Sequence, residues 1–135
     1  MAHALVEYSD NLTDQGDIRG LLKKIAAQMC NSNGVFPTGG IRIRANRLSE
    51  YVIADGEDDY AFVNIVVQMG SGRPADFKKQ FFDELFEIIK AHFAIIYASR
   101  YLAISLYVVE VNEGNSYKQN NIHAKFVSAM PPTKA

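Results

Sequence analysis

Tyr60-Ala-Phe-Val-Asn-Ile-Val-Val-Gln-Met69, followed at once by Gly70-Ser-Gly-Arg-Pro74, is the stretch that decides the fold. The first part is almost continuously apolar, which predicts a central strand. The glycine loop is tight, and Pro74 suits the first turn of a helix because its missing N–H is not needed there. Apolar residues then recur at 3.6-residue spacing from Phe77 to about Ser99, and Leu102–Val111 has the pattern of another buried strand. The stretch therefore predicts a strand–helix–strand unit.

The first half of the chain follows the same plan. Ala4–Tyr8 predicts a strand that ends in turn-forming residues. A helix with one apolar stripe should begin at Asp17, a plausible N-cap, and stop at Asn33-Gly34. In Ile41–Asn46 the apolar residues alternate with Arg42, Arg44 and Asn46, which is the period of a half-buried strand. The two arginines share the polar face of that strand.

The order of elements predicts an α+β fold in which two βαβ units form one mixed sheet with two helices packed on one face. A brief strand at Tyr51–Ile53, turning at Asp55-Gly56, should connect the units. We expect a single domain over residues 1–128 and a loose C-terminal tail over residues 129–135, which contain two prolines. The sheet face without helices would expose apolar residues to solvent. Because a second copy of the chain could bury that face, we expect a homo-oligomer.

Composition and charge argue against several classes of partner. The formal net charge of −1, with charges scattered along the chain, provides no basic field for nucleic acid. No window approaches the ~20 apolar residues of a membrane span, and no basic leader precedes an apolar stretch at the N-terminus. We therefore expect a cytoplasmic protein with neither nucleic acid nor membrane as a partner. Cys30 is the single cysteine, and we expect it to be a reduced, buried thiol.

Arg42 and Arg73 are the candidate binding residues. The glycines beside Arg73 allow close approach of the backbone to a ligand, and a helix N-terminus adds unpaired N–H groups, so a carboxylate would be favoured there. For an isolated segment of this kind, a tight turn that carries a solvated arginine is the commoner outcome, and the segment lacks the pattern of a phosphate-binding loop. Arg44 could pair with Glu50 or with a neighbouring subunit.

Other polar residues carry weaker signals. The three histidines, His3, His92 and His123, are too far apart in sequence to form a ligand motif, so we expect no metal. The acidic runs around Asp58 and Asp83 resemble solvated surfaces more than paired catalytic carboxylates.

Five segments together resemble the 5-carboxymethyl-2-hydroxymuconate isomerases of the tautomerase superfamily. They occur in the family's order and span nearly the whole chain: His3–Asn11, Phe36–Arg42, Ala54–Val63, Gly70–Arg73 and Lys118–Ala124. The resemblance implies a tautomerase-like fold, a homotrimer with active sites near subunit boundaries, and no cofactor. It also implies proton transfer within a small carboxylated 2-hydroxymuconate-type dienol during the degradation of aromatic acids.

In these enzymes an N-terminal proline is the general base and arginines hold the substrate carboxylates. Arg42 and Arg73 match the arginines, whereas Ala2 stands at the position of the proline. Removal of Met1 would leave a primary α-amine on Ala2, with an ordinary pKa of roughly 7.7 to 8.0. The resemblance thus assigns catalysis to Ala2, Arg42 and Arg73, and predicts an isomerase impaired by the missing proline. The alternative is a non-catalytic or repurposed member that binds a small dicarboxylate.

Overall fold

A computed structural model describes residues 1–127 of the chain. Four strands form the sheet: β1 (Ala2–Ser9), β2 (Arg42–Leu48), β3 (Tyr60–Gly70) and β4 (Tyr101–Val111). The α-helices are α1 (Ile18–Cys30), α2 (Ala75–His92), α3 (Ala94–Ser99) and α4 (His123–Val127). Short 3-10 turns occupy Asp10–Leu12, Thr38–Gly40 and Glu113–Asn115. The predicted tail at 129–135 lies outside the described residues, and the domain boundary stays a prediction.

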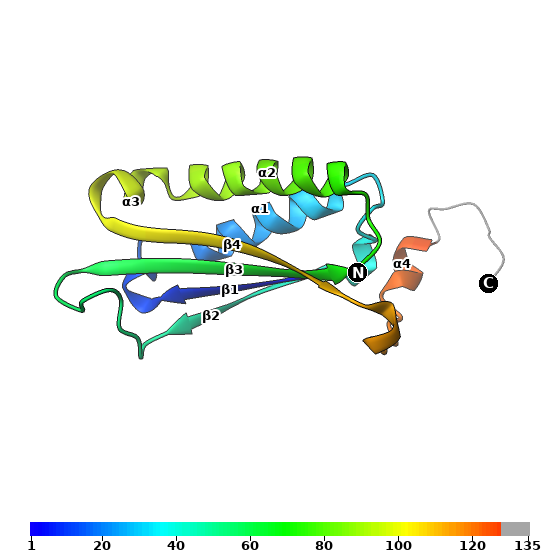
Figure 1. The fold of residues 1–135 in the computed structure, drawn as a ribbon, viewed down its shortest axis with the longest axis horizontal. Helices are drawn as coiled ribbons and strands as arrows, with labels where there is room; N and C mark the ends of the chain where they lie inside the picture. Colours follow the sequence, from blue (N-terminus) through cyan, green and yellow to red (C-terminus); the bar gives the residue numbers. More distant parts are fainter. Residues whose placement is uncertain (128–135) are drawn as a thin grey trace.

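The sheet has the order β2-β1-β3-β4, and its two halves run in opposite directions. β1 pairs in parallel with β2, β3 pairs in parallel with β4, and the central pair β1–β3 is antiparallel. Each parallel pair is joined through helices, which cross one face of the sheet (Figure 1). The predicted fold class is confirmed: two βαβ units share one mixed sheet.

One hydrophobic core lies between this sheet face and the helices. Inward-facing residues of β1 and β3 meet the apolar stripes of α1 and α2, and the fully buried side chains include Val6, Leu21, Ile65 and Leu85. The predicted N-cap of α1 is present, because the side chain of Asp17 accepts a hydrogen bond from the Gly20 N–H at 3.2 Å. Burial of this kind contributes about 25 cal/mol per Å² of apolar surface, so the packed stripes hold the helices to the sheet.

The structure corrects three details of the prediction. The long second helix is interrupted at Phe93, which has φ −100° and ψ 10°, although its buried stripe continues into α3 at Ile96. Residues 51–53 form no strand; they belong to a loop in which the Tyr51 hydroxyl donates to Asp10 at 3.2 Å. Cys30 is exposed, since it follows the buried Met29 and the helical rotation of about 100° per residue turns it away from the core.

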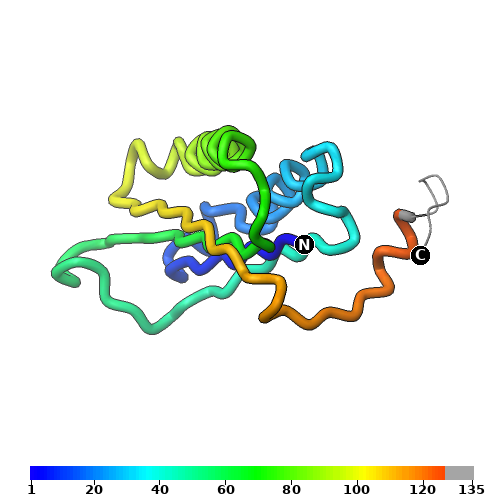
Figure 2. Tube along the Cα trace, turned by 45° about the vertical axis from the view of Figure 1, so that its right-hand side comes forward, coloured from blue at the N-terminus to red at the C-terminus, as the bar shows by residue number. Residues whose placement is uncertain are grey.

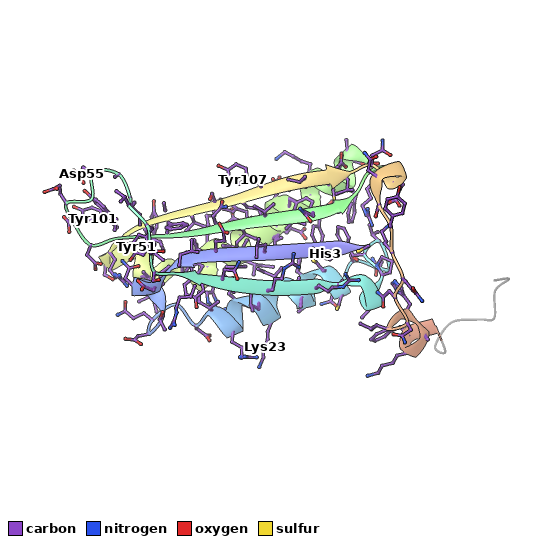
Figure 3. The ribbon with its side chains drawn as sticks, turned by 90° about the horizontal axis from the view of Figure 1, so that it is seen from below. His3, Lys23, Tyr51, Asp55, Tyr101 and Tyr107 are labelled. Atoms are coloured by element: carbon purple, nitrogen blue, oxygen red, sulfur yellow. The ribbon has the colours of Figure 1, made fainter. Side chains whose placement is uncertain are left out.

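The other face of the sheet carries no helix. His3 and Tyr107 lie on this open face, which Figure 3 shows from below. Apolar side chains of three adjacent strands form a row on it, because Leu5 pairs with Val66 and Val66 pairs with Tyr107. Tyr107 is 59% exposed, and Leu5 and Val66 are half-buried, so the protomer covers this row only in part.

The C-terminal segment returns to the end of the sheet at which the chain begins. After β4 it passes the N-terminus and ends in α4 (Figure 2). Gly39 fixes this arrangement, because a Cβ there would lie 2.7 Å from Nδ1 and 2.8 Å from Cα of His123. The Asn120 side chain also donates to the Gly39 carbonyl oxygen at 2.9 Å. A glycine is therefore required where the C-terminal segment meets the loop before β2.

Candidate functional site

A cavity of about 380 Å³ opens at the end of the sheet where the chain begins. The sheet and the N-terminus supply one set of its lining residues, and the C-terminal segment supplies the other. The lining consists of Met1, His3, Arg42, Gln68, Met69, Gly70, Val111, Glu113, Ser116, Tyr117, Lys118, Gln119 and Asn120. Strand register explains part of this set, because His3 of β1 lies between Arg42 of β2 and Gln68 of β3.

The α-amino group of Met1 belongs to this cavity and is held toward its neutral form. Burial lowers the pKa of this amine first, and the positive charges of Arg73, Lys118 and Arg42 lower it further, while Glu113 opposes them. A charged amine loses hydration on burial and is repelled by nearby cations, so both effects favour the free base. The cavity thus contains an amine that is suited to accept a proton.

His3 lies between Arg42 and Arg44, two of the arginines of β2. Its Nε2 lies 3.1 Å from a guanidinium nitrogen of Arg42 and 3.0 Å from the Met1 sulfur, and its Nδ1 lies 3.2 Å from a guanidinium nitrogen of Arg44. Burial and the two guanidinium groups lower the pKa of His3. A neutral imidazole has one acceptor nitrogen, so it can accept a hydrogen bond from one guanidinium group at a time. His3 therefore acts as a neutral spacer between two cations.

Arg73 lies behind the cavity wall at Gly70. Its guanidinium donates to the carbonyl oxygens of Gly70 at 2.8 Å and Val35 at 3.0 Å, and it stacks 4.8 Å from the centroid of the Phe36 ring. Its Nε is buried and has no hydrogen-bond partner among residues 1–127. The charge of Arg73 acts on the Met1 amine, although its side chain does not line the cavity of the protomer.

The C-terminal segment adds a charge pair that sequence reasoning missed. Lys118 Nζ lies 3.1 Å from Oε1 of Glu113, and both residues line the cavity. The other carboxylate oxygen of Glu113 approaches Gly70 so closely that a Cβ there would lie 2.5 Å from it. No periodicity marks these two residues, and Lys118 carried a signal only as part of the Lys118–Ala124 segment.

The structure places the three candidate catalytic residues at one end of the sheet. Ala2 is fully buried as the first residue of β1 and pairs with Met69, and its nitrogen is an amide while Met1 is present. Arg42 reaches the cavity directly, and Arg73 acts from behind it. Arg44 does not form an ion pair with Glu50 within the described chain; it contacts His3 instead, because the side chains of β1 and β2 share the open face.

Comparison with known proteins identifies the family. A model of the 5-carboxymethyl-2-hydroxymuconate isomerase family matches residues 2–126. The chain belongs to this family. It is 40% identical over 126 residues to the 5-carboxymethyl-2-hydroxymuconate Delta-isomerase of Escherichia coli, covering 93% of this chain and 99% of that protein.

Solved structures agree with this assignment to the 5-carboxymethyl-2-hydroxymuconate isomerase family. The isomerase of Deinococcus radiodurans R1 is 41% identical, with a TM-score of 0.88 and 93% coverage of each chain. A second 5-carboxymethyl-2-hydroxymuconate delta-isomerase is 27% identical, with a TM-score of 0.86, and covers 99% of this chain and 96% of its own. More distant neighbours share the tautomerase fold alone; one is a fused 4-OT that forms a symmetric trimer, at 16% identity and a TM-score of 0.60, covering 87% of this chain and 93% of that chain.

Residues 1–127 contain neither a membrane-spanning helix nor a cluster of metal ligands. None of the helices within residues 1–127 combines the length and apolar character that a bilayer crossing requires. The same residues contain no group of three or more His, Cys, Asp or Glu side chains arranged to hold a metal ion.

Proposed function

We propose that this protein is an isomerase that moves a proton within a carboxylated 2-hydroxymuconate-type dienol, such as 5-carboxymethyl-2-hydroxymuconate, in the degradation of aromatic acids. The observation that carries the proposal is the cavity that joins an amine of lowered pKa to Arg42. The family membership and the 40% identity to an isomerase support the same activity.

In the proposed reaction the N-terminal amine is the base. It takes the proton from the substrate hydroxyl, and the same proton then bonds to a carbon of the conjugated chain, which leaves a ketone. One O–H bond breaks and one C–H bond forms, so the reaction needs no oxidant and no cofactor. Arg42 holds a substrate carboxylate at the cavity, and the charge of Arg73, which acts from behind the wall at Gly70, helps to stabilise negative charge on the dienolate. In Met1-free protein the base is the Ala2 amine.

Ala2 sets the expected strength of this catalysis. A primary amine replaces the secondary amine of the proline that the resemblance implies, and with Met1 present the Ala2 nitrogen is an amide that cannot accept a proton. We therefore propose an impaired isomerase. The same substitution favours a second candidate, a non-catalytic member that binds a small dicarboxylate at the same cavity.

We also propose that the active unit is a homotrimer in the cytoplasm. The partly exposed row of Leu5, Val66 and Tyr107 supports self-association, since apolar surface of this kind is normally covered in an assembly. A distant structural neighbour is described as a symmetric trimer. The single, exposed Cys30 suits a reducing compartment.

Ketonisation of the dienol distinguishes the two candidates. We would measure it with protein that retains Met1, with protein freed of Met1, and with Met1-free Ala2→Pro protein. The isomerase proposal expects Met1 removal to raise the rate, because it frees the Ala2 amine, and Ala2→Pro to raise it sharply. Equal background rates in all three preparations, together with dicarboxylate binding, would establish the second candidate. A robust rate that survives Arg73→Ala unchanged would contradict the assignment of Arg73.

A further inference from the structure

The cavity contains more positive charge than one carboxylate needs. Arg42 lines it from the sheet, Lys118 lines it from the C-terminal segment, and Arg73 lies behind Gly70. Glu113 is the one carboxylate among the lining residues. A ligand with a single carboxylate would neutralise Arg42 and leave Lys118 paired only with Glu113.

The backbone around Lys118 is held in place. The Asn120 side chain donates to the Gly39 carbonyl oxygen at 2.9 Å and accepts from the Ile122 N–H at 2.8 Å. Gly39 in turn packs against His123, with no space for a side chain between them. Lys118 stands two residues before this anchor, so its backbone is held beside the cavity that the residue lines.

The pair between Lys118 and Glu113 is one that a ligand can open. The side chain of Glu113 is 65% exposed and that of Lys118 is 37% exposed. Solvent-exposed ion pairs contribute little to stability, because water screens the attraction and ordering two long side chains costs entropy. A substrate carboxylate that is already anchored at one end can replace Glu113 with little loss.

We propose that Lys118 binds a second carboxylate of the ligand, away from the carboxylate at Arg42, and that Glu113 holds the ammonium group until this carboxylate arrives. The inference rests on the proposed function and deepens it. Within the proposed substrate class, Lys118 is then the residue that favours ligands with two or more carboxylates over monocarboxylates.

Binding of unreactive ligands tests the inference without turnover. We would titrate the full chain, in its native oligomeric state, with adipate and with hexanoate, which differ in one terminal carboxylate. Lys118→Met should weaken adipate binding about 10-fold, the size of one charge-assisted hydrogen bond, and change hexanoate binding less than about twofold. Glu113→Gln should tighten adipate binding, because it removes the internal competitor. Lys79→Met, on the exposed side of α2, is the matched control and should change neither affinity.

Lys118→Arg should restore most of the adipate affinity, which separates loss of charge from loss of fold. Equal weakening of both ligands by Lys118→Met, or no weakening of adipate, would overturn the inference. If adipate binding follows the expected pattern while the dienol is not turned over, the proposed isomerase activity fails and the carboxylate site stands.

Discussion

Nε2 of His3 lies 3.1 Å from a guanidinium nitrogen of Arg42, across the parallel pairing of β1 and β2. The ring is close enough to accept a hydrogen bond from Arg42, and Arg44 approaches its other nitrogen. Protonation would remove the lone pair and place a third positive charge between two guanidinium groups. The neutral ring is therefore the form compatible with this end of the sheet.

This relationship predicts a pH dependence of stability. His3 has a pKa below 6.5 in the folded chain, so the unfolded chain binds the proton more readily. The stabilising contribution is complete above about pH 6.5 and is lost as the pH falls through the lowered pKa. His3→Gln keeps a hydrogen-bond acceptor but does not titrate. The difference in free energy of unfolding between wild type and His3→Gln, measured in urea at several pH values, should shift toward the variant below pH 6.5. A difference that does not vary with pH would contradict this role of His3.

The N-terminal amine should titrate below the ordinary α-amino range in protein that retains Met1. Burial lowers its pKa, Arg73 is the largest of the charges that lower it, and Glu113 raises it. Arg73→Met should therefore raise the pKa of the amine, and Glu113→Gln should lower it further. The rate of acylation of the amine as a function of pH measures these shifts directly. Shifts of the opposite sign would show that the charges around the amine are arranged differently.

Arg73→Lys should destabilise the protein even though the charge is kept. The guanidinium reaches two carbonyl oxygens, of Gly70 and Val35, and stacks on Phe36. An ammonium group cannot reproduce this planar fork, so a loss of about 1–2 kcal/mol in the free energy of unfolding is expected. Arg19→Lys on the exposed side of α1 is the control and should be neutral. Equal stability of both variants would mean that the contacts of Arg73 contribute nothing.

Gly39→Ala should separate the C-terminal segment from the loop before β2. The new Cβ would approach His123 to 2.7 Å at Nδ1 and 2.9 Å at the backbone nitrogen, and such overpacking costs about 1–3 kcal/mol. Gly40→Ala meets its neighbours at 3.4–3.5 Å and should be milder. Amide hydrogen exchange within α4 should accelerate in Gly39→Ala and remain slower in Gly40→Ala.

A charge in the row of apolar side chains on the open sheet face should dissociate the homo-oligomer. Val66 lies between Leu5 and Tyr107 in the register of the sheet, so Val66→Lys places an ammonium group in the middle of the surface that we expect to be covered. Sedimentation velocity should show a trimer for the wild type and a smaller species for the variant. Lys79→Glu, on α2, should leave the sedimentation coefficient unchanged. A wild-type monomer would contradict the proposed assembly.

The architecture could be predicted from the sequence because the apolar residues follow a clear period in the main strands and helices. Alternation identified β2, a continuous apolar run identified β3, and the stripes of α1 and α2 kept helical spacing. Periodicity did not reveal the interruption at Phe93, since the buried stripe continues through it. It also misplaced Cys30, where one step around the helix separates core from solvent.

The candidate site was only partly predictable. The strand face indicated Arg42, the glycine loop indicated Arg73, and the family resemblance supported both. Glu113 and Lys118, in contrast, lie in an irregular segment that no periodicity describes. His3 was dismissed because no ligand spacing includes it. The position of His3 beside Arg42 follows from strand register. Register depends on which strands pair, and composition does not specify the pairing.

The antiparallel centre of the sheet gives the molecule two ends with similar backbones. His3 lies beside Arg42 at one end, and Tyr60 lies beside Tyr101 at the other, each near the start of a parallel pair. The chain begins at the first end. A circular permutant opened between residues 49 and 59 would carry its free α-amine at the opposite end. In this scaffold, the position of the chain break therefore decides which end of the sheet contains the amine.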